Sequence, residues 1–251
     1  MTMSAATIPD ALIARLRTAQ RVAVLTGAGI SAESGVPTFR EAQTGLWARY
    51  NPEELATPEA FRHNPQLVWE WYTWRQELVS KAEPNPGHHA LVALEQRIPH
   101  FTLITQNVDG LHRRAGSHNV LELHGNLFRT KCFSEDQPVE SWPDHDTIPP
   151  RCPRCGGLLR PDVVWFGEML PASVLRAAQH AAAESEIFFS IGTSALVYPA
   201  ADLPFVALNA KAVLVEINPQ PTPLSAHATF SLSGAAGAIL PSLLERAWGT
   251  L

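Results

Sequence analysis

Short apolar runs rich in β-branched and aromatic residues alternate with amphipathic stretches along most of the chain. The runs predict strands at Arg21–Thr26, Phe101–Gln106, Val120–Leu123, Glu186–Ile191, Ala212–Ile217 and Thr229–Leu232. The amphipathic stretches predict helices, notably Pro86–Gln96, Pro171–Ala183 and a last helix from about Ile239 to Trp248. Strands that alternate with helices are typical of a doubly wound α/β fold, a mostly parallel sheet with helices on both faces. Such a sheet binds ligands at the carboxyl ends of its strands.

Two stretches interrupt this alternation. Residues 43–84 are rich in Trp and Pro and mostly helical in pattern, whereas residues 131–160 are polar, Pro-rich and hold all three cysteines. We interpret them as a helical insertion and a zinc-ribbon-like insertion that together form a smaller lobe. The sequence therefore predicts a single domain, 1–251, whose Rossmann-like large lobe comprises about 1–42, 85–130 and 161–251.

Composition narrows the class of protein. Of the 251 residues, 45% are hydrophobic and 17% are charged, as in an ordinary soluble globular protein. The net charge of −5 offers no basic footprint for nucleic acid, and no apolar run reaches the roughly 18 residues of a membrane span. Three cysteines do not pair into a disulfide framework and indicate thiols in a reducing compartment, or metal ligands. We therefore expect a cytoplasmic protein, monomeric by default, with no nucleic-acid or membrane partner.

The first 21 residues allow two interpretations. They are mildly basic and carry Ser and Thr, which is typical of a transit peptide. Leu12, Ile13 and Leu16, however, form an apolar helical face immediately before the first strand. We favour a helix of the fold, because removal of the segment would remove part of the core.

A glycine-rich turn follows the first predicted strand. Gly27, Gly29 and Ala32 match G-x-G-x-x-A, in which glycines allow a tight turn and close approach of a pyrophosphate at the N-terminus of the next helix. Alone, the motif is equally consistent with a structural turn. A dehydrogenase would continue with a second strand and an acidic residue about 20 positions on. The segment Ser34–Arg40 offers no such strand, which argues against simple hydride transfer.

Longer motifs carry a family resemblance. They are the segments Gly27–Arg40 (GAGISAESGVPTFR), Thr105–His112 (TQNVDGLH), Leu123–Gly125 (LHG) and Gly192–Ser194 (GTS). In this order, and spread over nearly the whole chain, they resemble the motifs of the sirtuins. That family couples removal of acyl groups from protein lysine to the consumption of NAD.

The resemblance implies a reaction. The acyl-lysine carbonyl oxygen attacks C1′ of the nicotinamide ribose, nicotinamide leaves, and O-acyl-ADP-ribose is formed. His124 would be the general base that takes a proton from a ribose hydroxyl. A lone histidine is usually structural, and only its motif and its strand-end position single out His124. Phe39 and Arg40 would cover the reacting ribose and limit attack by water.

The same resemblance implies the residues that contact NAD. Asp109 would hold the nicotinamide carboxamide, Gln106 and Asn107 would line the ribose side, and two later positions would flank the adenosine. The full set is Gly27, Ala28, Gly29, Ile30, Phe39, Arg40, Gln106, Asn107, Asp109, Gly192, Thr193, Ser194, Asn218 and Ala236.

The segment Val163–Glu168, after the second insertion, resembles the stretch on which sirtuins bind a peptide as an added strand. Main-chain pairing of this kind accepts many peptide sequences. The alternative is a core strand followed by a turn. The residues implied in substrate binding are Val164, Trp165, Phe166 and Gly167.

Tyr72 and Arg75 indicate which acyl group the protein takes. They lie three residues apart in the predicted helix Gln66–Lys81 and so share one face. A guanidinium can bind a carboxylate bidentately, and a neighbouring phenol adds a hydrogen bond. The pair is similar to that of the class III sirtuin branch, which removes succinyl and malonyl groups; acetyl would be secondary. The alternative is a solvated arginine on a helix whose core stripe is Trp71, Trp74 and Leu78.

The three cysteines lie at metal-ligand spacing. Cys152 and Cys155 form a C-x-x-C pair, but Glu135 stands where a partner for Cys132 belongs. Sirtuins usually carry two such cysteine pairs around a structural zinc. We favour zinc held by three thiolates and a fourth ligand from Glu135, Asp136 or water, with a metal-free lobe as the alternative. The reaction itself would need no metal.

Two rival functions stay open from the sequence. A mono-ADP-ribosyltransferase would activate NAD in the same way but would transfer its ribose, as ADP-ribose, to a protein nucleophile. A non-catalytic module would bind NAD or ADP-ribose without releasing nicotinamide. The acyl-pocket pair argues against the first, and His124 beside Asn107 and Asp109 argues against the second.

Overall fold

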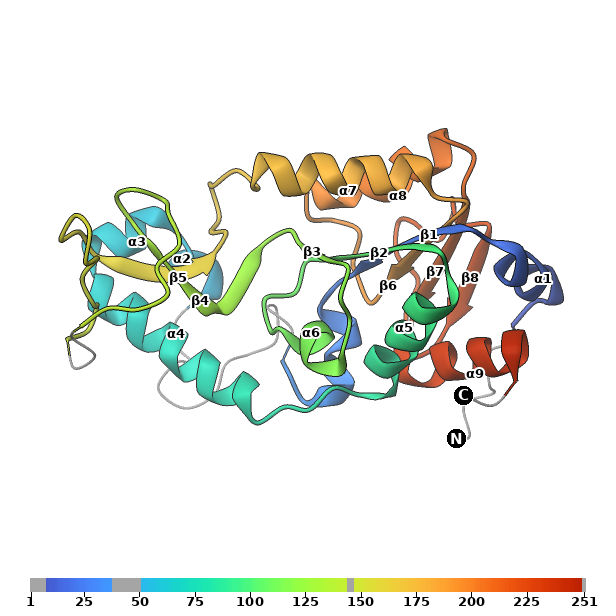
Figure 1. The fold of residues 1–251 in the computed structure, drawn as a ribbon, viewed down its shortest axis with the longest axis horizontal. Coiled ribbons are helices and arrows are strands. Elements are labelled where there is room, and N and C mark those ends of the chain that lie inside the picture. The colour runs from blue at the N-terminus through green and yellow to red at the C-terminus, as the bar shows by residue number, and fades with distance from the viewer. Residues whose placement is uncertain (1–7, 38–50, 144–146, 250–251) are drawn as a thin grey trace.

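A computed structural model describes residues 8–37, 51–143 and 147–249 of the chain. Parallel strands form a six-stranded central sheet in the order β3-β2-β1-β6-β7-β8 (Figure 1). Their bounds are β1 Arg21–Thr26, β2 His100–Thr105, β3 Val120–Glu122, β6 Ile187–Ile191, β7 Val213–Asn218 and β8 Phe230–Ser233. Strands of this kind are continuous apolar runs because both faces of the sheet are covered, and β6 is buried at every residue.

Each face of the sheet is covered by its own helices (Figure 1). Each face also has its own core cluster. Val22 and Val24 of β1 pack into one cluster and Ala23 and Leu25 into the other, as the alternation of side chains along a strand requires. The first cluster includes α1 (Asp10–Thr18), α5 (Pro86–Arg97) and α9 (Ala236–Trp248), and the second includes α7 (Ala172–Glu184) and α8 (Leu203–Asn209).

A small lobe, made of α2 to α4 and the antiparallel pair β4–β5, lies at one end of the molecule (Figure 1). It packs around a core cluster that contains Phe61, Trp71, Tyr72 and Trp165. Thr57 and Asn64 cap α3 and α4 by accepting hydrogen bonds from backbone N–H groups of the first turn, and each helix has proline in that turn. The elements are α2 Pro52–Leu55, α3 Pro58–His63, α4 Pro65–Ser80, and the antiparallel pair β4 Gly125–Cys132 and β5 Leu159–Val163.

The predicted fold class is confirmed, and the predicted strands of the central sheet agree with the observed ones within about one residue at each end. The last helix begins at Ala236 rather than Ile239. The apolar face of the N-terminal segment is buried in α1, as expected for a helix of the fold. None of the described helices has the length and hydropathy to cross a membrane.

Several local expectations were wrong. The glycine turn leads into two short 3₁₀ turns, Ala28–Ile30 and Ala32–Ser34, and not directly into an α-helix. The sequence pattern predicts neither β4 nor β5, and their sheet begins at Gly125, before the expected start of the insertion. The core stripe of the alternative interpretation does not hold at Leu78, which is 39% exposed, because α4 turns the face that carries Tyr72 toward the core of the small lobe.

Candidate active site

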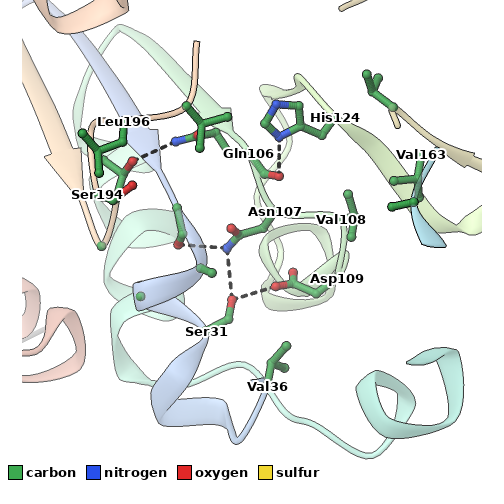
Figure 2. Close-up of a pocket in the computed structure, with 18 of the residues that line it drawn as sticks. Ser31, Val36, Gln106, Asn107, Val108, Asp109, His124, Val163, Ser194 and Leu196 are labelled. Carbon is green, nitrogen blue, oxygen red and sulfur yellow. Dashed lines mark hydrogen bonds between the residues drawn. The ribbon is translucent and has the colours of Figure 1, made fainter. Parts of the chain in front are cut away.

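A cavity of about 840 Å³ lies between the carboxyl edge of the central sheet and the small lobe (Figure 2). The parallel register places Thr26 of β1 beside Thr105 of β2 on one side and Ile191 of β6 on the other. The loops that follow these strands therefore meet at the cavity. β1 pairs with β2, the next strand in the chain, on one side and with β6, which comes much later, on the other. The strand order reverses at this point, and sheets of this kind bind ligands there.

Glycines bring the loop after β1 into backbone contact with the loop after β6. A Cβ atom on Gly27 would lie 2.7 Å from the carbonyl oxygen of Gly192, and one on Gly29 would lie 2.7 Å from the Cα of Gly192. Gly192 itself has a φ of +60°, which favours glycine. Of the predicted cofactor residues in these loops, Gly27, Ala28, Gly29 and Gly192 line the cavity, whereas Ile30 is buried in the core.

Gln106 and Asn107 follow β2 and cross-link the neighbouring loops. The side-chain amide of Gln106 donates to Thr193 Oγ1 at 3.0 Å. The side-chain amide of Asn107 donates to the Gly27 carbonyl at 3.1 Å and to Ser31 Oγ at 3.2 Å (Figure 2). Both predicted residues therefore line the cavity in orientations set by hydrogen bonds.

Asp109 is buried beside Ser31, just before α6 (Leu111–Ala115). Its carboxylate accepts from Ser31 Oγ at 2.7 Å and from the backbone N–H of Leu111 at 2.9 Å. Burial raises the pKa of the Asp109 carboxyl above its ordinary value, and the two hydrogen bonds oppose that rise. The sequence analysis missed Ser31, whose hydroxyl links Asn107 to Asp109 (Figure 2); its place inside the glycine motif was the available signal.

His124 lies between β3 and β4 and lines the cavity. Its Nδ1 is 2.9 Å from the carbonyl oxygen of Gln106 (Figure 2). A carbonyl oxygen can only accept, so Nδ1 carries the hydrogen and Nε2 is the basic nitrogen. Burial lowers the pKa of His124 below its ordinary value, and the bond to Gln106 opposes this. The ring is therefore neutral at pH 7 and can accept a proton at Nε2.

The loops after β6 and β7 form another part of the wall. Thr193, Ser194 and Asn218 line the cavity, and the side-chain amide of Asn218 donates to the Thr193 carbonyl at 3.0 Å. Ala236 is buried at the start of α9 and is not among the described lining residues.

The predicted site residues and the residues that line the cavity are not identical. Phe39 and Arg40 lie outside the described residues. The sequence analysis missed two lining segments, Leu196–Pro199 and Pro219–Thr222. Both begin within two residues of a predicted residue on the carboxyl side of a strand, and that position was the only signal for them.

The small lobe supplies the remaining wall of the cavity. Arg75 is half-buried, with its guanidinium carbon 5.1 Å from the centroid of the Trp71 ring. Burial lowers the pKa of Arg75, and Tyr72 and Asp109 oppose the change. Burial also raises the pKa of Tyr72 to about 12, so its phenol is protonated at neutral pH. All the predicted substrate residues line the cavity: Tyr72, Arg75, Val164, Trp165, Phe166 and Gly167.

The predicted metal ligands come together in the small lobe. One ligand atom from each of Cys132, Glu135, Cys152 and Cys155 lies within 4.8 Å of the others. Zinc–sulfur bonds of about 2.3 Å in a tetrahedron require sulfur atoms roughly 3.8 Å apart, so the donor set fits one zinc ion. Glu135 also accepts a hydrogen bond from Arg154 at 3.0 Å. Bound there, zinc would hold the two ends of the insertion together and take no part in catalysis.

Comparison with known proteins identifies the family. Residues 27–199 match the model of the Sir2 family. The chain belongs to this family. It is 50% identical over 244 residues to the NAD-dependent protein deacylase of Methylococcus capsulatus, a match that covers 94% of this chain and 96% of the relative.

Solved structures of Sir2 homologues share the fold. One, described as an NAD complex, has a TM-score of 0.88 at 46% identity, with 97% of this chain and 95% of that chain covered. A second is a mutant in complex with 2′-O-acetyl ADP ribose, with a TM-score of 0.86 at 48% identity and 96% of both chains covered. The sirtuin resemblance drawn from the motifs is thus confirmed.

We expect this Sir2-family protein, purified without chelator, to contain close to one zinc per chain. The ion should be held less tightly than by four thiolates, because a carboxylate is the harder and less usual ligand. Glu135→Cys should slow zinc transfer to a competing chelator, followed by absorbance, whereas Glu135→Gln should speed it. Fully stable protein without zinc, as judged by metal analysis and thermal unfolding, would show that the lobe folds without metal.

Proposed function

We propose that this NAD-dependent protein-lysine deacylase prefers lysines whose short acyl group ends in a carboxylate, succinyl or malonyl, with acetyl-lysine as a secondary substrate. Its products would be nicotinamide and O-acyl-ADP-ribose. The observation that carries the proposal is that Tyr72 and Arg75 line the same cavity as His124. Nicotinamide chemistry and acyl recognition would then take place in one enclosed space.

The carboxylate preference rests on the cost of burial. An ionised carboxylate that enters an apolar channel loses its hydration, a loss too large to leave unpaired. Arg75 offers a positive charge on the wall of the cavity, and Tyr72 lies one turn away on the same face of α4. An acetyl group has no charge to pair and gains nothing from the guanidinium.

The large lobe would hold the co-substrate. NAD, when bound, supplies a ribose whose C1′ becomes electrophilic as nicotinamide departs. Gly27, Gly29 and Gly192 present backbone on which a pyrophosphate can lie closely, because no side chain fits there. Asp109 would accept a hydrogen bond from the carboxamide of nicotinamide, and Asn218 would lie on the adenosine side.

His124 would act as the general base at Nε2. The Gln106 carbonyl fixes the tautomer, and burial keeps the ring neutral near pH 7. Asn107 would line the ribose beside it, oriented by its bonds to Gly27 and Ser31. A neutral imidazole held in one orientation can take a proton from a ribose hydroxyl without first losing one of its own.

The substrate protein would lie against the segment Val164–Gly167. The N–H groups of Val164 and Phe166 already donate to carbonyls of His124 and Ala56, at 2.8 and 2.9 Å. At these two residues a paired peptide would therefore be held through the carbonyl oxygens. Backbone pairing of this kind explains how one enzyme can accept acyl-lysine in many sequences.

Replacing His124 with alanine should lower the rate of nicotinamide release from acyl-peptide by about 10²–10⁴-fold, the usual effect of losing a general base. Calorimetry should show NAD binding nearly unchanged. In the parent enzyme the acid limb of kcat/KM should have its inflection below pH 6.5, because the buried histidine protonates only at lower pH.

His180→Ala, on the exposed surface of α7, is the matched control for that experiment. A normal rate in His124→Ala would remove His124 from the catalytic role. Detection of ADP-ribosylated protein in place of O-acyl-ADP-ribose would instead indicate a mono-ADP-ribosyltransferase.

Asp109→Asn should weaken binding of NAD more than binding of ADP-ribose, because only NAD carries the carboxamide that the carboxylate would accept from. Titration calorimetry on both ligands measures the difference. If the two affinities fall by the same factor, the loss reflects the bonds to Ser31 and Leu111 and not contact with nicotinamide.

Arg75→Met should raise KM for a succinyl-lysine peptide by tens-fold and leave the acetyl-lysine peptide nearly unaffected. A charge-assisted hydrogen bond contributes about 1.5–3 kcal/mol, and about 1.4 kcal/mol corresponds to tenfold. Tyr72→Phe should act in the same direction more weakly. The measurement is kcat/KM on one peptide carrying acetyl, malonyl or succinyl in turn.

Arg176→Met, on the exposed face of α7, controls for the loss of a positive charge elsewhere. Equal losses on acetyl and succinyl peptides would make Arg75 a packing residue, and the proposed preference would then be withdrawn.

A further inference from the structure

Trp165 lies directly behind the proposed carboxylate pair. It follows β5 by two residues and its side chain is almost fully buried, although it contributes to the cavity wall. Its indole Nε1 donates a hydrogen bond to Tyr72 Oη at 2.8 Å. The two rings are nearly parallel, with centroids 6.3 Å apart and planes inclined by 30°.

Arg160 also packs against the indole ring. The guanidinium carbon of Arg160 lies 3.2 Å from the centroid of the Trp165 ring. Arg160 in turn donates to both carboxylate oxygens of Glu168, at 2.5 and 3.0 Å, and to the Val163 carbonyl at 2.6 Å. Glu168 also accepts from the backbone N–H of Trp165 at 2.8 Å. Trp165 is therefore fixed by stacking and by its backbone before any substrate arrives.

The direction of the Trp165–Tyr72 bond has a consequence for the phenol. An indole N–H can only donate, so Tyr72 Oη is the acceptor in this contact. The single proton of the phenol must then point away from Trp165. Burial raises the pKa of Tyr72 to about 12, which keeps that proton in place at neutral pH.

We propose that the indole N–H of Trp165 is a specificity-determining group, which orients Tyr72 so that its hydroxyl donates to the carboxylate of a succinyl or malonyl group. This inference rests on the proposed function. Trp165 acts through Tyr72 and is a positioning residue, not a catalytic one. Without the indole N–H, the phenol is free to turn its proton toward another acceptor, and part of the preference for charged acyl groups is lost.

If Trp165 were only a packing residue, its replacement would have a different effect on the two substrates. Its ring also contacts Phe61, with centroids 5.3 Å apart, so a smaller ring leaves space in the small lobe. That defect would disturb acetyl and succinyl substrates alike. The proposed role, in contrast, requires the hydroxyl of Tyr72 and affects only the substrate that bears a carboxylate.

A double-mutant cycle separates the two roles. The variants are Trp165→Phe, Tyr72→Phe and the double variant, each assayed for kcat/KM on matched succinyl and acetyl peptides. Trp165→Phe should lower the succinyl-to-acetyl ratio by about three- to tenfold, as expected for one oriented hydrogen bond. In the Tyr72→Phe background the same change should alter the ratio by less than about twofold.

Two further variants keep the test decisive. Trp248→Phe, in α9 and away from the cavity, controls for a tryptophan-to-phenylalanine change. Replacement of Trp165 by benzothienylalanine preserves the shape of the ring and removes only the N–H, which covers the case in which Trp165→Phe folds poorly; thermal unfolding monitors this.

The outcomes distinguish the inference from the function on which it rests. A parent enzyme without preference for succinyl over acetyl peptide overturns the proposed function and this inference together. A parent that prefers succinyl, with the ratio unchanged in both Trp165 variants, overturns the inference alone. An equal fall of the ratio in the presence and absence of the Tyr72 hydroxyl would also overturn it.

Discussion

The site depends on one close contact between backbones, where the loop after β1 lies against the loop after β6 without any Cβ between them. The contact continues the hydrogen bonding of the sheet beyond its strands. Gly27 N–H donates to the Ile191 carbonyl at 3.0 Å, Gly29 N–H to Gly192 at 2.8 Å, and Gly192 N–H to Ile217 at 3.0 Å. Because the ladder sets the relative positions of these loops, the cavity has a floor of backbone whose shape does not depend on flexible side chains.

Buried polar groups at this floor are joined to one another. Thr26 Oγ1 donates to Thr105 Oγ1 at 2.8 Å, and Thr105 Oγ1 accepts from the Asn107 N–H at 3.0 Å. Ser31 then connects Asn107 to Asp109. Leaving such groups buried without partners would be costly, so the network both stabilises the fold and orients the side chains that face a ligand. The donors and acceptors of the site are in place before substrate binds, which is the condition for effective electrostatic stabilisation.

The central sheet could be predicted from the sequence because its strands are buried on both faces and stand out as apolar runs. β4 and β5 could not, because polar and charged residues such as Arg129 and Asp162 interrupt them and pair with each other on the surface. Motifs located the glycine loop, Asp109 and His124.

Other features of the site could be seen only in the folded structure. The spacing of Tyr72 and Arg75 placed them on one face of α4 but said nothing of the indole that contacts the phenol from a position 93 residues later in the chain. Ile30 belongs to the glycine motif and Ala236 was expected beside the adenosine, yet both are buried in the core, because a sequence pattern marks a loop and not which way each side chain points.

His124 connects the two lobes. Its ring is bound to the Gln106 carbonyl of the large lobe, while its own carbonyl accepts from Val164, next to the strand β5 of the small lobe. The following residue, Gly125, has a φ of +81°, and a Cβ there would lie 2.0 Å from the Asp162 carbonyl oxygen. Only glycine therefore fits at this position, where the chain passes from one lobe to the other. A shift of β5 relative to the central sheet would therefore move His124, the proposed general base, as well as the wall that carries Trp165. For this reason an effect on acyl selectivity can be assigned to the small lobe only where turnover of an acetyl peptide, for which the same base is proposed, is unchanged.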